Sequence, residues 1–228
     1  MGGFDLVGKF QEGGWAMWPL LISSVLAVAF AFERLIVLFL QKRKLKPEEF
    51  LEAFEKKMEQ LGGDRDAVVA DMSALCKKRG GVCAEVMLEG LTKFRQGRSL
   101  KMPPFELKNW LNGAIEERAR VSLPQLEAHL VVLSVVATVA PLIGLLGTVL
   151  GMIQAFEVMA SAAGGAKPDE LAGGISVALI TTATGMMIAI PVLILYNWIK
   201  SMIENYVMLV EEAAIHLVDN LILEKVVD

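Results

Sequence analysis

Residues 141 to 152, PLIGLLGTVLGM, lie inside an uncharged run that is long enough to cross a membrane. The run extends from Ala128 to Phe156 without Asp, Glu, Lys or Arg, and its 29 residues would measure about 43 Å as an α-helix. A bilayer core of about 30 Å needs only about 20 apolar residues. The quoted stretch nevertheless contains three glycines, which are poor helix formers, and a lone hydroxyl at Thr148.

Two further runs have the same character, from Gly13 to Phe32 and from Leu171 to Ile199. We expect the first run to be a retained helix and not a secretory signal, because the residues before it do not form a basic segment. The chain is 54% hydrophobic, with a mean hydropathy of +0.51. We therefore predict an all-α membrane protein with three transmembrane helices, at 15–40, 128–160 and 171–199.

The basic residues predict the orientation, because 17 of the 22 Lys and Arg lie between residues 41 and 127. The prediction is a periplasmic N-terminal segment at 1–14, a cytoplasmic helical domain at 41–127, a periplasmic loop at 161–170 and a cytoplasmic C-terminal helix at 200–228. The second and third transmembrane helices are long enough to extend into the cytoplasm. The net charge of −4 and the scattered basic residues argue against nucleic-acid binding.

The segment from 41 to 127 has helical periodicity, with breaks expected at Gly62–Gly63, Gly80–Gly81 and Pro103–Pro104. We expect neither a disulfide nor a zinc site at Cys76 and Cys83, which lack a CxxC pair. Apolar residues also form a seam after residue 199, which fits packing against the chain's own helices or against sister subunits. This seam consists of Ile203, Val207, Val210, Ala214, Leu217 and Leu221.

Small and hydroxyl residues recur at three- and four-residue intervals on the second and third predicted spans. One reading is close helix packing, and the other is a polar path in which hydroxyls coordinate a cation or hold water. The clustered threonines of TTAT, residues 181 to 184, favour the path. The candidate ion pathway is Thr148, Thr181 and Thr182, and the candidate pore-face small residues are Gly144, Gly151, Ala178 and Gly185.

The uncharged runs of these two spans, 128–156 and 171–199, contain no ionisable carboxylate or amine, although paths for protons or sodium ions commonly use one. If the chain conducts ions, we expect the carboxylate to come from a partner protein. Glu33 and Arg34 lie near the end of the first span, where an ion pair or snorkelling accounts for them. No arrangement of nucleophile, acid and base predicts an enzyme, and His129 and His216 have no metal-ligand spacing, so we expect no metal or cofactor besides a transported H⁺ or Na⁺.

Three stretches resemble the MotA/TolQ/ExbB family of proton or sodium channel subunits, in its ExbB/TolQ-like branch with three spans. They are GGWAMWPLLISSVLAVAFAFERL at 13–35, APLIGLLGTVLGMIQAF at 140–156, and GGISVALITTATGMMIAIPVLILYNW at 173–198. The resemblance covers nearly the whole chain. It implies a bacterial inner-membrane protein with a periplasmic N-terminus and a cytoplasmic C-terminus.

The resemblance also implies a homopentamer around two copies of an ExbD/TolR-like single-helix partner, whose membrane aspartate carries the ion. Ion flow would then drive mechanical work in the envelope, with a TonB/TolA-like protein as a further partner. The residues matching Thr148 and Thr182 line the interface with that aspartate in the family. The glycines would keep the lumen face smooth for a moving helix.

One position departs from the family pattern, because Val177 stands where ExbB and TolQ usually have glutamate. The stretch GISVALITT is closer to sodium-driven flagellar stators, in which the threonine matching Thr181 is associated with sodium. An extra hydroxyl can replace part of the hydration shell of Na⁺, which a proton does not need. In the alternative, Thr181 bonds to its own helix backbone and the ion is H⁺.

Two other functions compete with an ion-driven motor. The first is a non-conducting membrane scaffold whose small-residue stripes only pack helices and whose cytoplasmic domain recruits a partner. The second is a secondary transporter, which is disfavoured because the sequence shows no inverted repeat or broken helix. The sequence does not indicate whether the work done is outer-membrane import, maintenance of the envelope or gliding.

Overall fold

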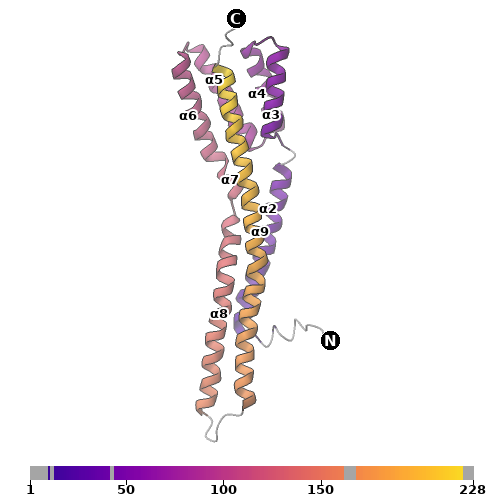
Figure 1. Ribbon diagram of the computed structural model, residues 1–228, viewed down its shortest axis with the longest axis vertical. Helices are drawn as coiled ribbons and strands as arrows, with labels where there is room; N and C mark the ends of the chain where they lie inside the picture. Colours follow the sequence, from indigo (N-terminus) through magenta and orange to yellow (C-terminus); the bar gives the residue numbers. More distant parts are fainter. Residues whose placement is uncertain (1–9, 11–12, 42–43, 162–167, 223–228) are drawn as a thin grey trace. The chain divides into compact units, whose positions relative to one another are not determined.

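The computed structural model describes residues 10, 13–41, 44–161 and 168–222, and the ordered elements in these ranges are helices (Figure 1). In chain order they are η1 (Gly14–Ala16), α2 (Met17–Gln41), α3 (Pro47–Gln60), α4 (Arg65–Arg79), α5 (Val82–Ser99), α6 (Pro104–Ser122), α7 (Pro124–Glu127), α8 (Leu130–Ser161) and α9 (Pro168–Ile222). The expectation of an all-α protein is confirmed for the described residues.

Three helical stretches are long and apolar enough to cross a membrane, namely Gly14–Gln41, Leu130–Ala160 and Ala172–Ile222. Their most apolar windows have mean hydropathies of 2.1, 2.5 and 2.2. This agrees with the three predicted spans. The predicted loop at 161–170 and the predicted segment at 1–14 fall largely outside the described residues, as do the last six residues of the predicted C-terminal helix.

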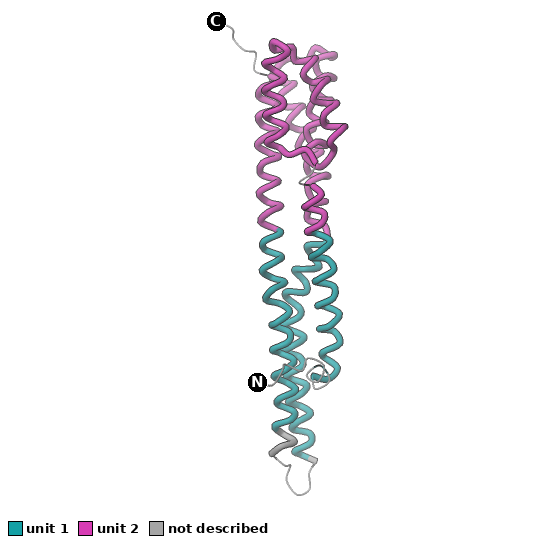
Figure 2. Tube along the Cα trace, turned by 90° about the vertical axis from the view of Figure 1, so that its right-hand side faces the viewer, with its two compact units in different colours: residues 1–34, 129–199 teal, residues 35–128, 200–228 magenta. Residues whose placement is uncertain are grey.

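The chain divides into two compact units, which Figure 2 shows in different colours. The first unit consists of residues 1–34 and 129–199, and the second unit of residues 35–128 and 200–228. Helix α9 contributes to both, with its residues up to 199 in the first unit. It is a single helix of 55 residues, so the predicted third span and the predicted C-terminal helix are one element.

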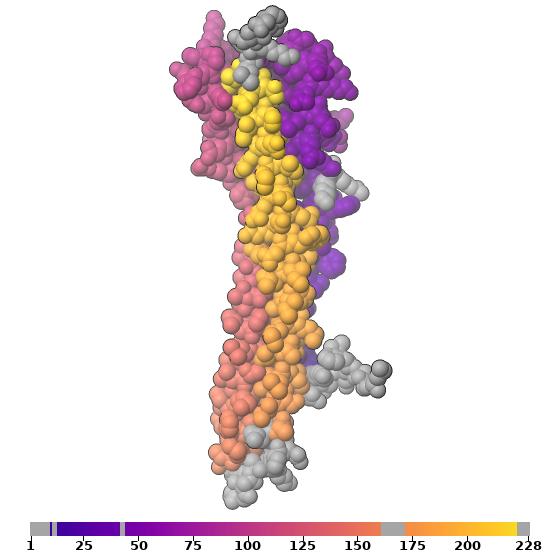
Figure 3. Space-filling view, viewed as in Figure 1, coloured from indigo at the N-terminus to yellow at the C-terminus, as the bar shows by residue number. Residues whose placement is uncertain are grey.

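In the first unit, α8 and the adjacent part of α9 lie side by side (Figures 1 and 3). Apolar side chains dominate both helices, as expected for elements surrounded by lipid. Each helix contains one proline, at Pro141 and Pro191. A smaller cluster joins α2 to them through Met17, Leu20 and Ala189.

The second unit has a core of large side chains from α3, α4, α5, α6 and α9. Phe50, Phe54 and Phe94 are at most 1% exposed. The predicted seam on α9 packs into this core through Val210, Ala214, Leu217 and Leu221. Packing against the chain's own helices is therefore confirmed, and packing against a sister subunit stays a prediction.

The helix boundaries of the second unit follow the predicted breaks. Asp64 caps α4, because its carboxylate accepts hydrogen bonds from the backbone N–H groups of Asp66 at 3.1 Å and Ala67 at 3.3 Å. Gly80 and Gly81, which separate α4 from α5, have φ of 63° and 103°, a region that favours glycine. Pro104 begins α6 at a position where a missing N–H costs nothing.

The chain does not form one continuous helix before the second span. Helix α6 ends at Ser122, the short α7 covers Pro124–Glu127, and α8 begins only at Leu130. Between them Ala128 is extended and His129 has a φ of 63°. The helix is thus interrupted at Leu123 and again at residues 128 and 129.

Candidate functional site

Glycines let α8 and α9 approach to backbone contact in the first unit. A Cβ added at Gly144 would lie 2.9 Å from the Thr181 carbonyl oxygen. One added at Gly185 would lie 2.6 Å from the Ala140 carbonyl oxygen. Because backbone atoms cannot rotate away, neither position accepts a side chain without a shift of one helix. Close approach of this kind is the usual role of small residues in membrane helix pairs.

The same contact continues along both helices toward residues 151 and 174. A Cβ at Gly151 would lie 3.1 Å from the Ala178 Cβ, and one at Gly174 would lie 2.7 Å from the Ala155 Cβ. Gly147 also belongs to the contact, since its Cβ would lie 2.5 Å from the Thr181 Oγ1. Gly147 was not among the candidate residues, although its three- and four-residue spacing from Gly144 and Gly151 indicates the same helix face.

Two of the three candidate threonines bond within this contact. Thr182 donates to the Gly144 carbonyl of the other helix at 3.0 Å. Thr181 donates to Ala178 in its own helix at 2.8 Å, and its Oγ1 also lies 3.4 Å from the Gly144 carbonyl oxygen. Thr181 is 1% exposed, whereas Thr182 is half-buried. The bond from Thr181 to its own helix backbone, foreseen in the proton-driven alternative, is present.

Thr148 lies apart from that hydrogen-bond network. Its hydroxyl donates to the Leu145 carbonyl one turn earlier in α8 at 2.6 Å, and the side chain is half-buried. Thr184, next to the candidate pair, likewise donates within its helix, to Ile180 at 2.8 Å. Thr148 is accordingly a hydroxyl on α8 that remains partly accessible beside the α8–α9 contact.

The structure brings six of the seven candidate residues into the α8–α9 contact of one chain. They are Thr181, Thr182, Gly144, Gly151, Ala178 and Gly185. Intrachain packing accounts for the small residues without a pore. Their assignment to a pore face, and an ion-pathway role for the threonines, stay predictions.

The chemistry available along this contact is limited to hydroxyl and carbonyl oxygens. Residues 130–156 of α8 and 172–199 of α9 contain no Asp, Glu, Lys or Arg. Hydroxyl and carbonyl oxygens can hold water or coordinate a cation, but they do not take up a proton near neutral pH. A proton carrier on this path would have to come from elsewhere.

A second polar group of the first unit lies where α8 begins. Arg34 on α2 is 4% exposed and contacts Glu33, with 3.2 Å between Nη2 and Oε1. His129 Nδ1 lies 2.9 Å from the same carboxylate oxygen and 3.1 Å from Arg34 Nη2. The Glu33–Arg34 ion pair was foreseen. The participation of His129 was not, because 95 residues separate it from Arg34 and no pattern connects them.

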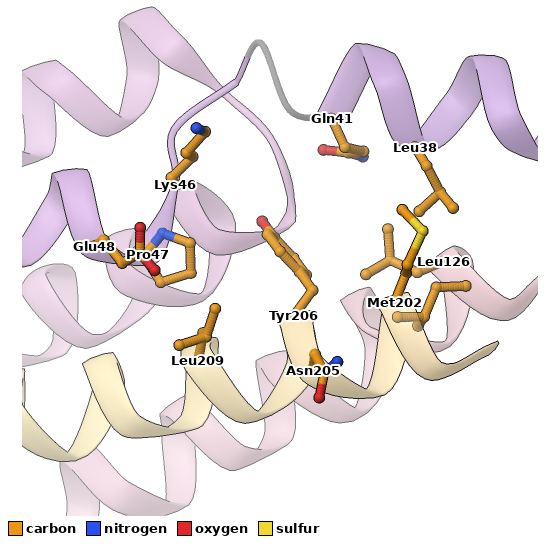
Figure 4. A pocket seen from close by; sticks show the side chains of 11 residues that line it. Leu38, Gln41, Lys46, Pro47, Glu48, Leu126, Met202, Asn205, Tyr206 and Leu209 are labelled. Atoms are coloured by element: carbon orange, nitrogen blue, oxygen red, sulfur yellow. The ribbon is translucent and has the colours of Figure 1, made fainter. Parts of the chain in front are cut away.

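The second unit contains a cavity of about 390 Å³. Figure 4 shows Tyr206 in the middle of its lining, with Pro47 on one side and Met202 on the other. Leu38, Leu126, Ile203 and Leu209 add apolar wall, and Lys46 adds a basic side chain. All the lining residues belong to the second unit, and none of them takes part in the α8–α9 contact.

The two cysteines of the second unit are buried free thiols. Burial raises the pKa of each thiol from 9.0 to about 12, so the reactive thiolate is scarce at neutral pH. Within the described ranges, no group of three or more His, Cys, Asp or Glu side chains is arranged to hold a metal ion.

Comparison with known proteins gives a consistent result. The pattern of the MotA/TolQ/ExbB proton channel family matches residues 82–212. The putative biopolymer transport protein ExbB-like 1 of Synechocystis sp. is 31% identical over 203 residues, which cover 86% of this chain and 71% of the relative. Biopolymer transport protein exbB1 of Vibrio cholerae is 30% identical over 181 residues, covering 79% and 73%. Biopolymer transport protein ExbB of Aquifex aeolicus is 34% identical over 110 residues, covering 48% and 66%.

Proposed function

The chain belongs to the MotA/TolQ/ExbB proton channel family, and from that premise we propose that it is the ion-conducting subunit of a motor in the bacterial inner membrane. Family membership and the ExbB-named relatives make it a membrane channel-like subunit of energy transduction. The proposal adds that H⁺ or Na⁺ flow through it drives mechanical work in the envelope.

The observation that carries the proposal is a hydroxyl-bearing helix contact without any ionisable group. Thr182 and Thr148 offer oxygens beside the α8–α9 contact, while residues 130–156 of α8 and 172–199 of α9 supply no carboxylate. A single-helix partner of the ExbD/TolR kind, carrying a membrane aspartate, would complete the path. We propose a homopentamer of this chain around two such partner helices, with a TonB/TolA-like protein receiving the work.

The half-buried threonines are the better candidates to face the partner. Thr182 bonds across the contact and Thr148 bonds only in its own helix, so both keep lone pairs that could meet an ion or a carboxylate. Thr181 is almost fully enclosed between α8 and α9, which supports a packing role. This enclosure favours H⁺ as the ion, and the sodium hypothesis requires an ion to reach Thr181 between the helices.

The test is ion flux through the full-length protein reconstituted in liposomes with its single-helix partner, under separate H⁺ and Na⁺ gradients. Thr182→Val and Thr148→Val should each lower the flux about tenfold, which corresponds to losing about 1.4 kcal/mol of stabilisation. Thr138→Val is the matched control, because Thr138 lies on α8, is exposed and donates to its own helix at Ser134. The partner with its aspartate changed to asparagine is the blank.

A second pair of variants separates the two ions. Thr181→Ser keeps the hydroxyl, and Thr181→Ala removes it together with the same methyl group. Na⁺-driven flux that survives in the serine variant and disappears in the alanine variant would assign a sodium filter to this hydroxyl. H⁺-driven flux that tolerates both variants would assign proton conduction.

The scaffold remains the second candidate, and one observation favours it. The glycines, Ala178 and Thr181 are all explained by packing between α8 and α9 of one chain. If neither ion shows partner-dependent flux while the helix pair is intact, the result favours a non-conducting scaffold.

A further inference from the structure

Three charged or titratable side chains of the first unit meet at the residue that precedes α8. His129 Nδ1 lies 2.9 Å and 3.0 Å from the two carboxylate oxygens of Glu33 and 3.1 Å from Nη2 of Arg34. The Phe30 ring stands edge-on to the imidazole, with ring centroids 5.4 Å apart. The α8–α9 contact discussed above uses none of these side chains.

Nδ1 of His129 lies between a hydrogen-bond donor, Arg34, and a hydrogen-bond acceptor, Glu33. Without a proton, Nδ1 carries a lone pair that accepts a hydrogen bond from Arg34. With a proton, Nδ1 donates to the Glu33 carboxylate. A single nitrogen cannot do both at the same time, so the location of one proton decides which residue of α2 is hydrogen-bonded to His129.

The charges around His129 oppose one another. Glu33 stabilises a protonated imidazole, whereas Arg34 and the positive N-terminal end of the α8 dipole destabilise it. The acidic residue within α8, Glu157, is 28 residues further along, about 42 Å away. Residues 172–199 of α9 contain no Asp, Glu, Lys, Arg or His, and their titratable residue is Tyr196. Glu127, two residues earlier in the chain, is exposed.

The site is both accessible and held in place. The His129 side chain is 51% exposed, so solvent can deliver or remove a proton. The Arg34 side chain is 5% exposed, which restricts its movement. His129 also has a φ of 63°, a conformation that non-glycine residues adopt only where their surroundings impose it.

We propose that His129 is a proton-binding site at the start of α8, where one proton per chain moves the Nδ1 hydrogen bond from Arg34 to Glu33. Solvent supplies the proton, and no covalent bond other than N–H forms or breaks. Histidine side chains in general change charge between about pH 5 and 8, and this is the range in which the exchange is tested. The proposal does not depend on ion conduction through the α8–α9 contact.

The test uses nitrogen-15 NMR of the full-length protein in lipid nanodiscs with labelled histidine, because nitrogen shifts report which ring nitrogens carry protons. The chain has two histidines, so a His216→Gln variant assigns the signals. His129 Nδ1 should change from unprotonated to protonated as the pH falls from about 8 to 5. Glu33→Gln should move the midpoint down because a negative charge is lost, Arg34→Gln should move it up because a positive charge is lost, and both should leave His216 unchanged.

Several outcomes would overturn the proposal. Nδ1 of His129 carrying its proton throughout the range, or never acquiring one, removes the exchange. A midpoint that Glu33→Gln leaves unmoved or raises removes the role of the carboxylate. Arg34 is buried, so the Arg34→Gln variant could fail to fold. In that case the midpoint measured for Glu33→Gln tests the proposal by itself. The Glu33 side chain is half-exposed, and glutamine retains its shape.

Discussion

The α8–α9 contact of the first unit excludes large side chains, whereas the core of the second unit is made of them. Between α8 and α9, Gly144 and Gly185 meet backbone atoms of the opposite helix, and the Thr182 hydroxyl bonds across. In the second unit, Phe50, Phe54 and Phe94 fill the space between helices. The two interiors belong to the same chain but are stabilised by different forces.

The difference reflects the solvent in which each interior forms. In water, removing large apolar side chains from contact with solvent is the main driving force, so a core gains from phenylalanine and methionine. Between helices in lipid there is no such gain, and association depends on close packing and interhelical hydrogen bonds. A substitution should therefore have opposite consequences in the two places: loss of volume harms the second unit, and gain of volume harms the α8–α9 contact.

The largest effect is expected from removing volume in the second unit. Phe94→Ala should lower the free energy of unfolding by about 3–5 kcal/mol, because a cavity replaces a side chain that is 1% exposed. Denaturant titration in detergent, followed by far-UV circular dichroism, measures the change. Phe105→Ala is the control, since Phe105 on α6 is 77% exposed. Equal losses in the two variants would contradict a core of this kind.

Adding volume to the α8–α9 contact should have the next largest effect. Gly185→Ala should destabilise the helix pair by about 1–3 kcal/mol, because the new Cβ would meet the Ala140 carbonyl and force a backbone shift. Gly173→Ala on the same helix is the matched control, since no atom lies within 4 Å of its added Cβ. Unfolding in increasing fractions of a denaturing detergent gives both values. A Gly185 variant as stable as the Gly173 variant would show that the helices are not this close.

The interhelical hydrogen bond should make a smaller contribution. Thr182→Val should cost about 0.6 kcal/mol, and no more than about 1.7 kcal/mol, which is the range for such bonds between membrane helices. Thr138→Val, which loses only a bond within α8, should cost less. The same detergent titration measures both. If Thr138→Val proves the more costly change, the bond from Thr182 to Gly144 does not stabilise the pair.

The buried thiols should leave the free energy of unfolding independent of pH near neutrality and should lower it in alkali. Burial raises the pKa of Cys76 and Cys83 from 9.0 to about 12, so folding favours the protonated thiol. That stabilisation is complete below about pH 9 and declines as the pH rises toward 12. Unfolding measured from pH 7 upward should show a steeper alkaline loss in the natural chain than in a Cys76→Ala, Cys83→Ala double variant.

A labelling experiment checks the same thiols independently. Maleimide at about pH 7 should modify both cysteines slowly in the folded chain and rapidly after denaturation, because the thiolate is the reactive form. Rapid labelling of the folded chain would mean that the thiols are not enclosed by the second unit.

The sequence predicted the helices better than their contacts. Gly80, Gly81 and Pro104 mark helix boundaries because their backbone requirements are local, and the structure confirms those boundaries. The sequence also predicted that the small residues lie on one face of each helix, since spacing alone determines which residues share a face. Spacing does not identify what covers that face, and the structure places the neighbouring helix of the same chain against it.

Contacts between distant segments were the part that the sequence could not supply. Thr182 and Gly144 are 38 residues apart, and no local preference pairs them. His129 appeared to be an isolated histidine because its partners lie on another helix. Its left-handed backbone conformation was equally hidden, since only a few per cent of non-glycine residues adopt that region.

The glycine contacts also restrict how this sequence can evolve. The obstacle to a side chain at Gly147 is the Thr181 side chain, so a mutation there could be rescued by a smaller residue at 181. The obstacle at Gly185 is the carbonyl of Ala140, a group that every residue has. No second mutation at Ala140 can remove it. Gly147 and Thr181 should therefore covary among descendants that keep this packing, whereas Gly185 should stay fixed regardless of genetic background.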